Sequence, residues 1–189
     1  MTVNTAQRVY LVYLVDTGKI LRRHTTSDPT NITVNTGESV YAGDADSDNY
    51  KIINGFLVEQ SDDDRAPARA QERKREIARE QFQRTKNKFT FMNSLFDFDT
   101  VSQTRIDGAS ALAIAAMASG AQVGDLRWHG GTEDFAWITQ DNSIILMDAQ
   151  TVLGLGKAAA EHVRAHVFAA RALKDDPTIT DVTADIHWP

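Results

Sequence analysis

A highly charged stretch in the middle of the chain limits how this sequence can fold. Residues 68–86 read ARAQERKREIAREQFQRTK, in which nearly every residue favours a helix and opposite charges recur on neighbouring turns. The only large apolar residues in the stretch are Ile77 and Phe82. A helix with so narrow an apolar stripe cannot form a core by itself, so we expect the compact parts of the chain to lie before and after it.

The sign of the charge also changes around this stretch. Residues 41–64 hold seven acids and one base, residues 65–88 hold nine bases and three acids, and residues 89–189 hold thirteen acids and six bases. A basic segment therefore separates two acidic ones. We predict three parts: an N-terminal unit at 1–60, a charged linker helix at 61–88 and a C-terminal domain at 89–189.

The first 60 residues carry the signals of a small antiparallel β unit. Residues 8–26 predict a hairpin that turns at Gly18, and residues 39–42 predict a short strand. Asn54-Gly55 between two β-rich arms predicts a second hairpin with a type I′ turn.

The C-terminal region predicts two helices and two more hairpins, so the fold class is expected to be α+β. One hairpin spans 89–98 and turns at Asn93-Ser94, and another spans 135–146. The first helix should begin near Thr100, which stands three residues before Gln103 as in a capping box, and should stop at Gly120.

The second helix should be capped by Asp148 and run to about Lys174. It carries a broad apolar stripe that should face the core. The residues of this stripe are Val152, Leu153, Ala159, Val163, Val167 and Ala170.

Composition removes several classes of function. No apolar run approaches 18 residues, so no membrane span is expected, and MTVNTAQRVY at the N-terminus does not look like a signal peptide. The chain has no Cys, which excludes disulfides, thiolate metal sites and Cys nucleophiles. A net charge of −6 and the interleaved Glu of the basic stretch argue against nucleic acid as a partner.

The acidic stretch DADSDNYKIING at 44–55 resembles the start of a calcium-binding loop. Asp44, Asp46 and Asp48 fill the first three ligand positions, but the last position, where a bidentate Glu is needed, holds Gly55. We therefore interpret the stretch as a solvated turn before a strand.

His162 and His166 lie four residues apart on the second predicted helix, so both imidazoles share one face, as in helical zinc sites. Val163 stands where the zincin pattern needs Glu, and a third ligand would have to come from elsewhere, such as Asp134 or His129. We favour a surface or boundary histidine pair, with a metal-dependent enzyme as a minor alternative.

The remaining motifs also have structural interpretations. Gly154 and Gly156 form G-x-G, but Ala160 occupies the third position of the dinucleotide fingerprint, so close helix packing is favoured. Asp97 and Asp99 alternate before a predicted helix, and favourable charge at a helix N-terminus explains Asp99. No catalytic, cofactor-binding or metal-binding residue is predicted.

Some large apolar, aromatic and basic side chains are predicted to contact a protein partner. Three Trp residues in the C-terminal region more often fill a core or an interface than a sugar platform. The candidate partner contacts are Arg69, Arg73, Ile77, Phe82, Trp128 and Trp188.

The order of these motifs resembles a known family. A hairpin is followed by DFDTVSQTRIDGASALA, a Trp-containing strand, DNSIILMDAQTVLGLGKAAAEHV and a terminal I-x-W-P. This order is similar to a domain of unknown function found in bacteriophage tail, tail-fibre and tail-fibre-assembly proteins, over about 89–189. The positions that carry the resemblance are Ser102, Arg105, Ile106, Trp128, Asp141, Asn142, Asp148, Trp188 and Pro189.

The resemblance implies a non-enzymatic tail or baseplate protein that attaches to a tail fibre or a neighbouring tail protein. An assembly chaperone absent from the mature particle is the alternative. The implied partners are other tail or fibre proteins, with a homo-oligomer such as a trimer also possible, and the implied location is the virion tail or the host cytoplasm during assembly. No cofactor is implied.

Overall fold

The structure, a computed structural model, describes residues 6–189 and divides into two compact units, one ending at Glu72 and one spanning Arg73–Pro189. Helices and small antiparallel sheets make up the fold, which confirms the predicted α+β class. The boundary between the units falls inside helix α1 (Asp62–Thr85), the helix that the charged stretch predicts. The three-part division of the sequence stays a prediction.

The first unit is built on a three-stranded sheet with the order β2-β1-β3. β1 (Arg8–Leu14) and β2 (Ile20–Thr26) form the predicted hairpin, and β3 (Glu38–Ala42) pairs with the other edge of β1. A short 3-10 helix, η1 (Pro29–Asn31), lies between β2 and β3. Alternate residues of β1 point to opposite faces, and both faces are covered. The buried residues are Tyr10, Val12 and Ile32 on one side, and Leu11, Ile20 and Ile52 on the other.

The second predicted hairpin of this unit is also present, as β4 (Tyr50–Ile53) and β5 (Phe56–Glu59). Its turn residues Asn54 and Gly55 have φ of 51° and 81°, as a type I′ turn requires. The Gly18 carbonyl accepts a hydrogen bond from the Ile52 N–H (2.8 Å). Gly18 has φ of 72°, and a Cβ there would collide with the Ile52 carbonyl, so only glycine fits this contact.

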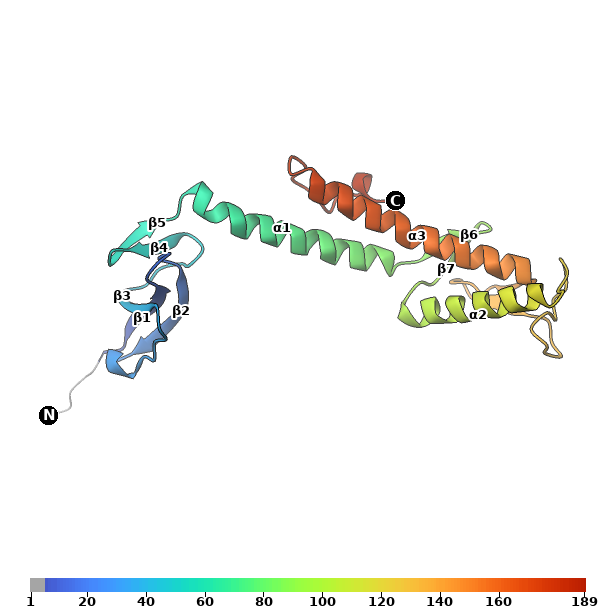
Figure 1. Ribbon diagram of the computed structural model, residues 1–189, viewed down its shortest axis with the longest axis horizontal. Helices are drawn as coiled ribbons and strands as arrows, with labels where there is room; N and C mark the ends of the chain where they lie inside the picture. The colour runs from blue at the N-terminus through green and yellow to red at the C-terminus, as the bar shows by residue number, and fades with distance from the viewer. Residues whose placement is uncertain (1–5) are drawn as a thin grey trace. The chain divides into compact units, whose positions relative to one another are not determined.

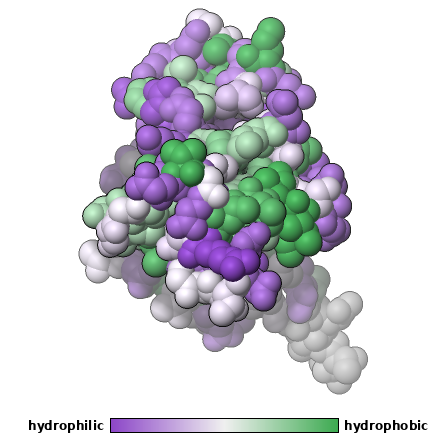
Figure 2. Space-filling view, turned by 90° about the vertical axis from the view of Figure 1, so that its right-hand side faces the viewer, coloured by the Kyte–Doolittle hydropathy of each residue, from purple (hydrophilic) through white to green (hydrophobic). Residues whose placement is uncertain are grey.

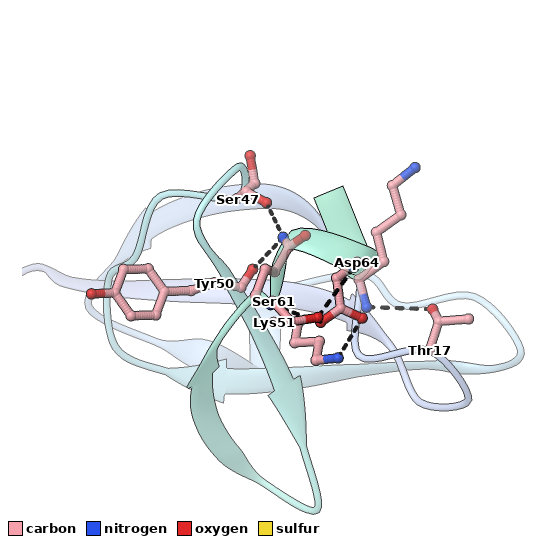
Figure 3. Close-up of polar contacts among 8 residues, drawn as sticks. Thr17, Ser47, Tyr50, Lys51, Ser61 and Asp64 are labelled. Atoms are coloured by element: carbon pink, nitrogen blue, oxygen red, sulfur yellow. Dashed lines mark hydrogen bonds and ion pairs between the residues drawn. The ribbon is translucent and has the colours of Figure 1, made fainter. Parts of the chain in front are cut away.

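Helix α1 begins at Asp62, because Ser61 and Asp64 cap it reciprocally (Figure 3). The Ser61 N–H donates to the Asp64 carboxylate (2.9 Å), and the Asp64 N–H donates to Ser61 Oγ (3.2 Å). Lys51 of β4 donates to the same carboxylate (2.6 Å) and, as the largest cause, lowers the pKa of Asp64 to about 2. This ion pair fixes the start of the helix to the β4–β5 hairpin.

The second unit packs two helices side by side, with two short hairpins beside them (Figure 1). Besides the last part of α1, its elements are β6 (Phe89–Phe91), β7 (Ser94–Phe96), α2 (Thr100–Ala118), β8 (Ala136–Ile138), β9 (Ile144–Leu146), α3 (Ala149–Asp175) and the 3-10 helix η2 (Asp185–His187). Its main core comprises Phe89, Phe96, Phe98, Ile106, Ala113, Trp128, Met147, Ala149, Val152, Leu155 and Ala159.

Two local predictions in this unit are wrong by one residue. The β6–β7 turn is Met92-Asn93, with φ of 50° and 61°, because a two-residue type I′ turn needs positive φ at both positions and Ser94 is already paired in β7. The predicted start of α2 at Thr100 is confirmed, but the capping residue is Asp99 and not Thr100. The Asp99 carboxylate accepts hydrogen bonds from the Val101 and Ser102 N–H groups.

The close packing predicted at Gly154 and Gly156 is present. A Cβ on Gly154 would lie 3.2 Å from the Phe91 ring, and one on Gly156 would collide with Ser110 of α2. Asp148 caps α3 as predicted: its carboxylate accepts the Thr151 N–H (2.8 Å) and also the Gly124 N–H (2.8 Å). The two glycines let α3 approach β6 and α2 closely, and Asp148 sets where α3 begins.

Candidate functional site

Two of the predicted partner contacts on α1 make contacts inside the second unit instead. Ile77 is fully buried against Leu173, Val182 and Trp188. The guanidinium of Arg73 donates to three carbonyls, those of Leu173 (2.8 Å), Asp176 (2.9 Å) and Ile179 (2.6 Å). This part of α1 is therefore fixed to the end of α3 through its narrow apolar stripe and Arg73.

The two predicted Trp contacts are also buried. Trp128 is 7% exposed and donates its indole N–H to the Met147 carbonyl (2.9 Å). Trp188 is 8% exposed and donates to the Val182 carbonyl (2.9 Å). Both act as core residues with satisfied polar groups, so their indoles are not available at the surface.

Arg69 and Phe82 are the two candidates with exposed side chains. Arg69 forms an ion pair with Asp62 (3.3 Å). Phe82 is 54% exposed, and the Lys86 ammonium lies 4.2 Å from the centre of its ring. Phe82 therefore remains an exposed aromatic ring beside a basic side chain.

The two histidines of α3 lie beside the end of α1 and strand β6. The two ring centres are 4.4 Å apart; His162 Nε2–H donates to the Thr85 carbonyl (3.1 Å), and His166 Nδ1–H donates to the His162 carbonyl (2.8 Å). The apolar stripe predicted for α3 is wrong at Val167, which is exposed. His166 is buried in its place: it is 4% exposed and stacks on Trp188. Burial, followed by the charge of His166, lowers the pKa of His162.

Within residues 6–189 no group of three or more His, Asp or Glu side chains is placed to hold a metal ion. In the acidic stretch, Asp44 forms an ion pair with Arg23. Asp46 accepts hydrogen bonds from the Asp48 N–H (2.9 Å) and the Asn49 side chain (2.6 Å), which organises the turn before β4. This geometry agrees with the interpretation as a turn.

The β8–β9 hairpin presents an apolar surface that the sequence analysis did not identify. Cross-strand pairing sets Ile138 opposite Ile144 and Ala136 opposite Leu146, so these four side chains share one face, which we call the hairpin face. Ile138, Ile144 and Leu146 are 63%, 68% and 52% exposed. Figure 2 shows hydrophobic residues gathered on the face that it draws.

The sequence of this hairpin is apolar on both faces, so it could not show alone which face is exposed. The alternate pair in the same hairpin, Trp137 and Ile145, packs against the core. Because both faces of the hairpin are apolar, alternation cannot say which face is buried. A two-stranded hairpin with two apolar faces does indicate that one of them remains exposed unless something covers it.

The turn of this hairpin is held rigidly. The Gln140 N–H donates to the Leu95 carbonyl of β7 (2.9 Å). Asp141 accepts from the Thr139 hydroxyl (2.6 Å), the largest cause of its lowered pKa, and from the Ser143 N–H (3.1 Å). The hairpin face is thus a preformed surface.

The segments before and after β8 are acidic. Residues 125–141 hold four acids and one base, a net charge of −3 with His neutral. The single base, Arg127, is already paired with Asp134 (3.1 Å). Glu133 lies before β8 and Asp141 in the turn after it, so negative charge lies at both ends of the hairpin. A partner for this surface would need apolar side chains with basic neighbours.

The fold and the hairpin face define an α+β unit with an exposed, preformed apolar surface. The family model described as "Domain of unknown function (DUF4376)" matches residues 67–187, which is more than half of the chain, and the chain therefore belongs to this family. Neither a curated protein nor a solved structure matches this chain. None of the helices described in residues 6–189 has a stretch long and apolar enough to cross a membrane.

Proposed function

We propose that this chain is a non-enzymatic structural protein of a bacteriophage tail or baseplate, and that it attaches to a tail fibre or a neighbouring tail protein through the hairpin face. The observation that carries the proposal is the exposure of Ile138, Ile144 and Leu146 on one rigid surface. Contiguous apolar patches of this kind mark protein contacts more often than isolated exposed residues do.

Two further observations support the proposal. The order of motifs in residues 89–189 resembles domains of phage tail proteins. Three residues considered for chemistry in the sequence, His162, His166 and Asp99, have hydrogen-bond partners that belong to helix ends or to the packing of the second unit.

The test is mass spectrometry of purified, salt-washed virions of the phage that encodes the chain. We expect peptides of this chain at a fixed copy number. Virions assembled with Ile144→Glu should contain at least about tenfold fewer copies, because a charge replaces an apolar contact. Ile114→Glu on α2, at a residue 53% exposed, is the matched control and should leave the copy number unchanged.

Absence from washed virions, with abundance in the infected lysate, would contradict the structural role. It would favour a chaperone that leaves before the particle matures. Absence from both would reject the phage assignment.

A further inference from the structure

Helix α1 carries a second exposed surface in the same unit. Positions 75, 78, 79 and 82 lie on one side of α1, because each is three or four residues from another of them, and residue 86 directly follows the last helical residue, Thr85. We call this surface the Phe82 face. It consists of Arg75, Ala78, Arg79, Phe82 and Lys86. Phe82 is its one large apolar side chain, 54% exposed, with the Lys86 ammonium over its ring.

The charge around the Phe82 face is opposite to that around the hairpin face. The Phe82 face holds three bases, Arg75, Arg79 and Lys86, and no acid, whereas residues 125–141 carry a net charge of −3. The whole chain carries −6, so two copies repel each other in most orientations. Contact between a Phe82 face and a hairpin face is an orientation in which the charges attract.

The apolar groups of the two faces also suit each other. The hairpin face offers three aliphatic side chains around a rigid hairpin, and the Phe82 face offers one aromatic ring at the centre of a basic surface. An aromatic residue buried among aliphatic ones, with charges at the rim, is the usual arrangement of an energetically important contact.

From this complementarity we infer that the protein assembles head to tail with copies of itself: the hairpin face of one copy receives the Phe82 face of the next. The inference rests on the proposed role of the hairpin face as a protein contact, and it identifies the occupant as a second copy of this chain. Because the two faces differ, a row of copies has an unused hairpin face at one end and an unused Phe82 face at the other. Association therefore continues until a ring closes, or it gives an open chain.

Sedimentation velocity of the full chain, over a range of concentrations and at low and high salt, tests the inference. We expect the wild type to associate at low salt and to dissociate as salt rises from about 0.05 to about 0.5 M, because screening weakens the attraction between the faces. Phe82→Glu and Ile144→Glu should each weaken association at least about tenfold. Circular dichroism would verify that both variants are folded.

An equimolar mixture of these two variants gives the sharpest result. Each variant retains the face that the other has lost, so the mixture should form a dimer, and nothing larger, although each variant alone is monomeric. A matched control is Phe168→Glu on α3, which also replaces an exposed Phe (62%) that lies beneath an Arg. This control should associate like the wild type.

Three results would overturn the inference. They are a wild type that stays monomeric at about 0.1 mM and low salt, a mixture that remains monomeric while each variant has lost association, and loss of association in Phe168→Glu or Ile114→Glu. The proposed function has a separate test: a monomeric chain that is nevertheless present in washed virions would show that another tail protein occupies the hairpin face.

Discussion

Two glycines inside helices have different surroundings. Gly108 on α2 faces open space, with no atom within 4 Å of where a Cβ would be placed. Gly156 on α3 faces Ser110 of α2, and a Cβ there would overlap the Ser110 hydroxyl. Glycine lowers helix stability wherever it stands, so its presence is useful only where the missing side chain lets another element approach.

Replacement of each glycine by alanine should therefore change stability in opposite directions. Gly108→Ala should raise the free energy of unfolding by about 0.5–1 kcal/mol, since the unfolded chain loses freedom and nothing clashes. Gly156→Ala should lower it by about 1–2 kcal/mol, because the two helices must separate or Ser110 must move. Urea unfolding followed by circular dichroism measures both changes.

The Ser110→Ala substitution provides the control for this comparison. Combined with Gly156→Ala, it removes the overlapping hydroxyl and should restore part of the lost stability. Equal effects of the two glycine substitutions would show that the close approach of α2 and α3 at Gly156 is not a constraint.

At the scale of elements, the end of α3 depends on α1. The last carbonyls of a helix have no partner within the helix, and Arg73 supplies donors to those of Leu173 and Asp176. The same guanidinium also holds the Ile179 carbonyl in the segment that follows. One side chain thus joins α1, α3 and the chain beyond α3.

Arg73→Ala should lower the free energy of unfolding by about 2–3 kcal/mol, since hydrogen bonds from a charged group to three carbonyls are lost together. Arg73→Lys should recover only part of this, because a single ammonium cannot reach three acceptors in the geometry of a guanidinium. Lys74→Ala, at the neighbouring exposed residue, should change stability by less than about 0.5 kcal/mol. If Arg73→Ala and Lys74→Ala are equivalent in urea unfolding, the fold does not need this contact.

His162 should make the second unit less stable in acid. The folded state holds the pKa of His162 below its ordinary value, mainly through burial and then through His166. The unfolded chain therefore binds more protons below about pH 6.5. The contribution of a neutral His162 is fully present above that pH and is lost as the pH falls through the folded pKa.

His162→Phe should flatten this dependence, because the ring still packs against Phe89 and Phe98 but no longer titrates. Trp fluorescence during urea unfolding, at about pH 7.5 and about pH 5.5, gives the comparison. A variant that loses as much stability between these pH values as the wild type would exclude His162 as the source.

Local signals explain which elements could be predicted from sequence. Asn54-Gly55, Gly18 and Asp148 act through turn and cap chemistry within a few residues, and their hairpins and helix lie where expected. The packing of α1 could not be predicted, because Ile77 contacts residues about one hundred positions away. The hairpin face was missed for the same reason: only the tertiary fold decides which side of β8–β9 meets the core.

On the scale of the whole molecule, each unit has cores of its own. Leu11 belongs to a cluster within the first unit, and Leu173 to one within the second. The chain also carries a natural set of probes. Its four Tyr residues, at 10, 13, 41 and 50, all precede the boundary at residue 72, and its three Trp residues, at 128, 137 and 188, all follow it.

We expect the two units to unfold in separate transitions that these probes distinguish. Leu11→Ala should lower the midpoint of the Tyr-detected transition by at least about 8 °C and leave the Trp-detected one unchanged. Leu173→Ala should do the reverse. Each substitution removes about 2–5 kcal/mol of core packing from one unit only. The double variant should show the sum of the two effects. The two signals would be recorded by near-ultraviolet circular dichroism and Trp fluorescence in one thermal scan. A single transition that both probes follow, lowered by either substitution, would mean that α1 couples the units into one cooperative fold.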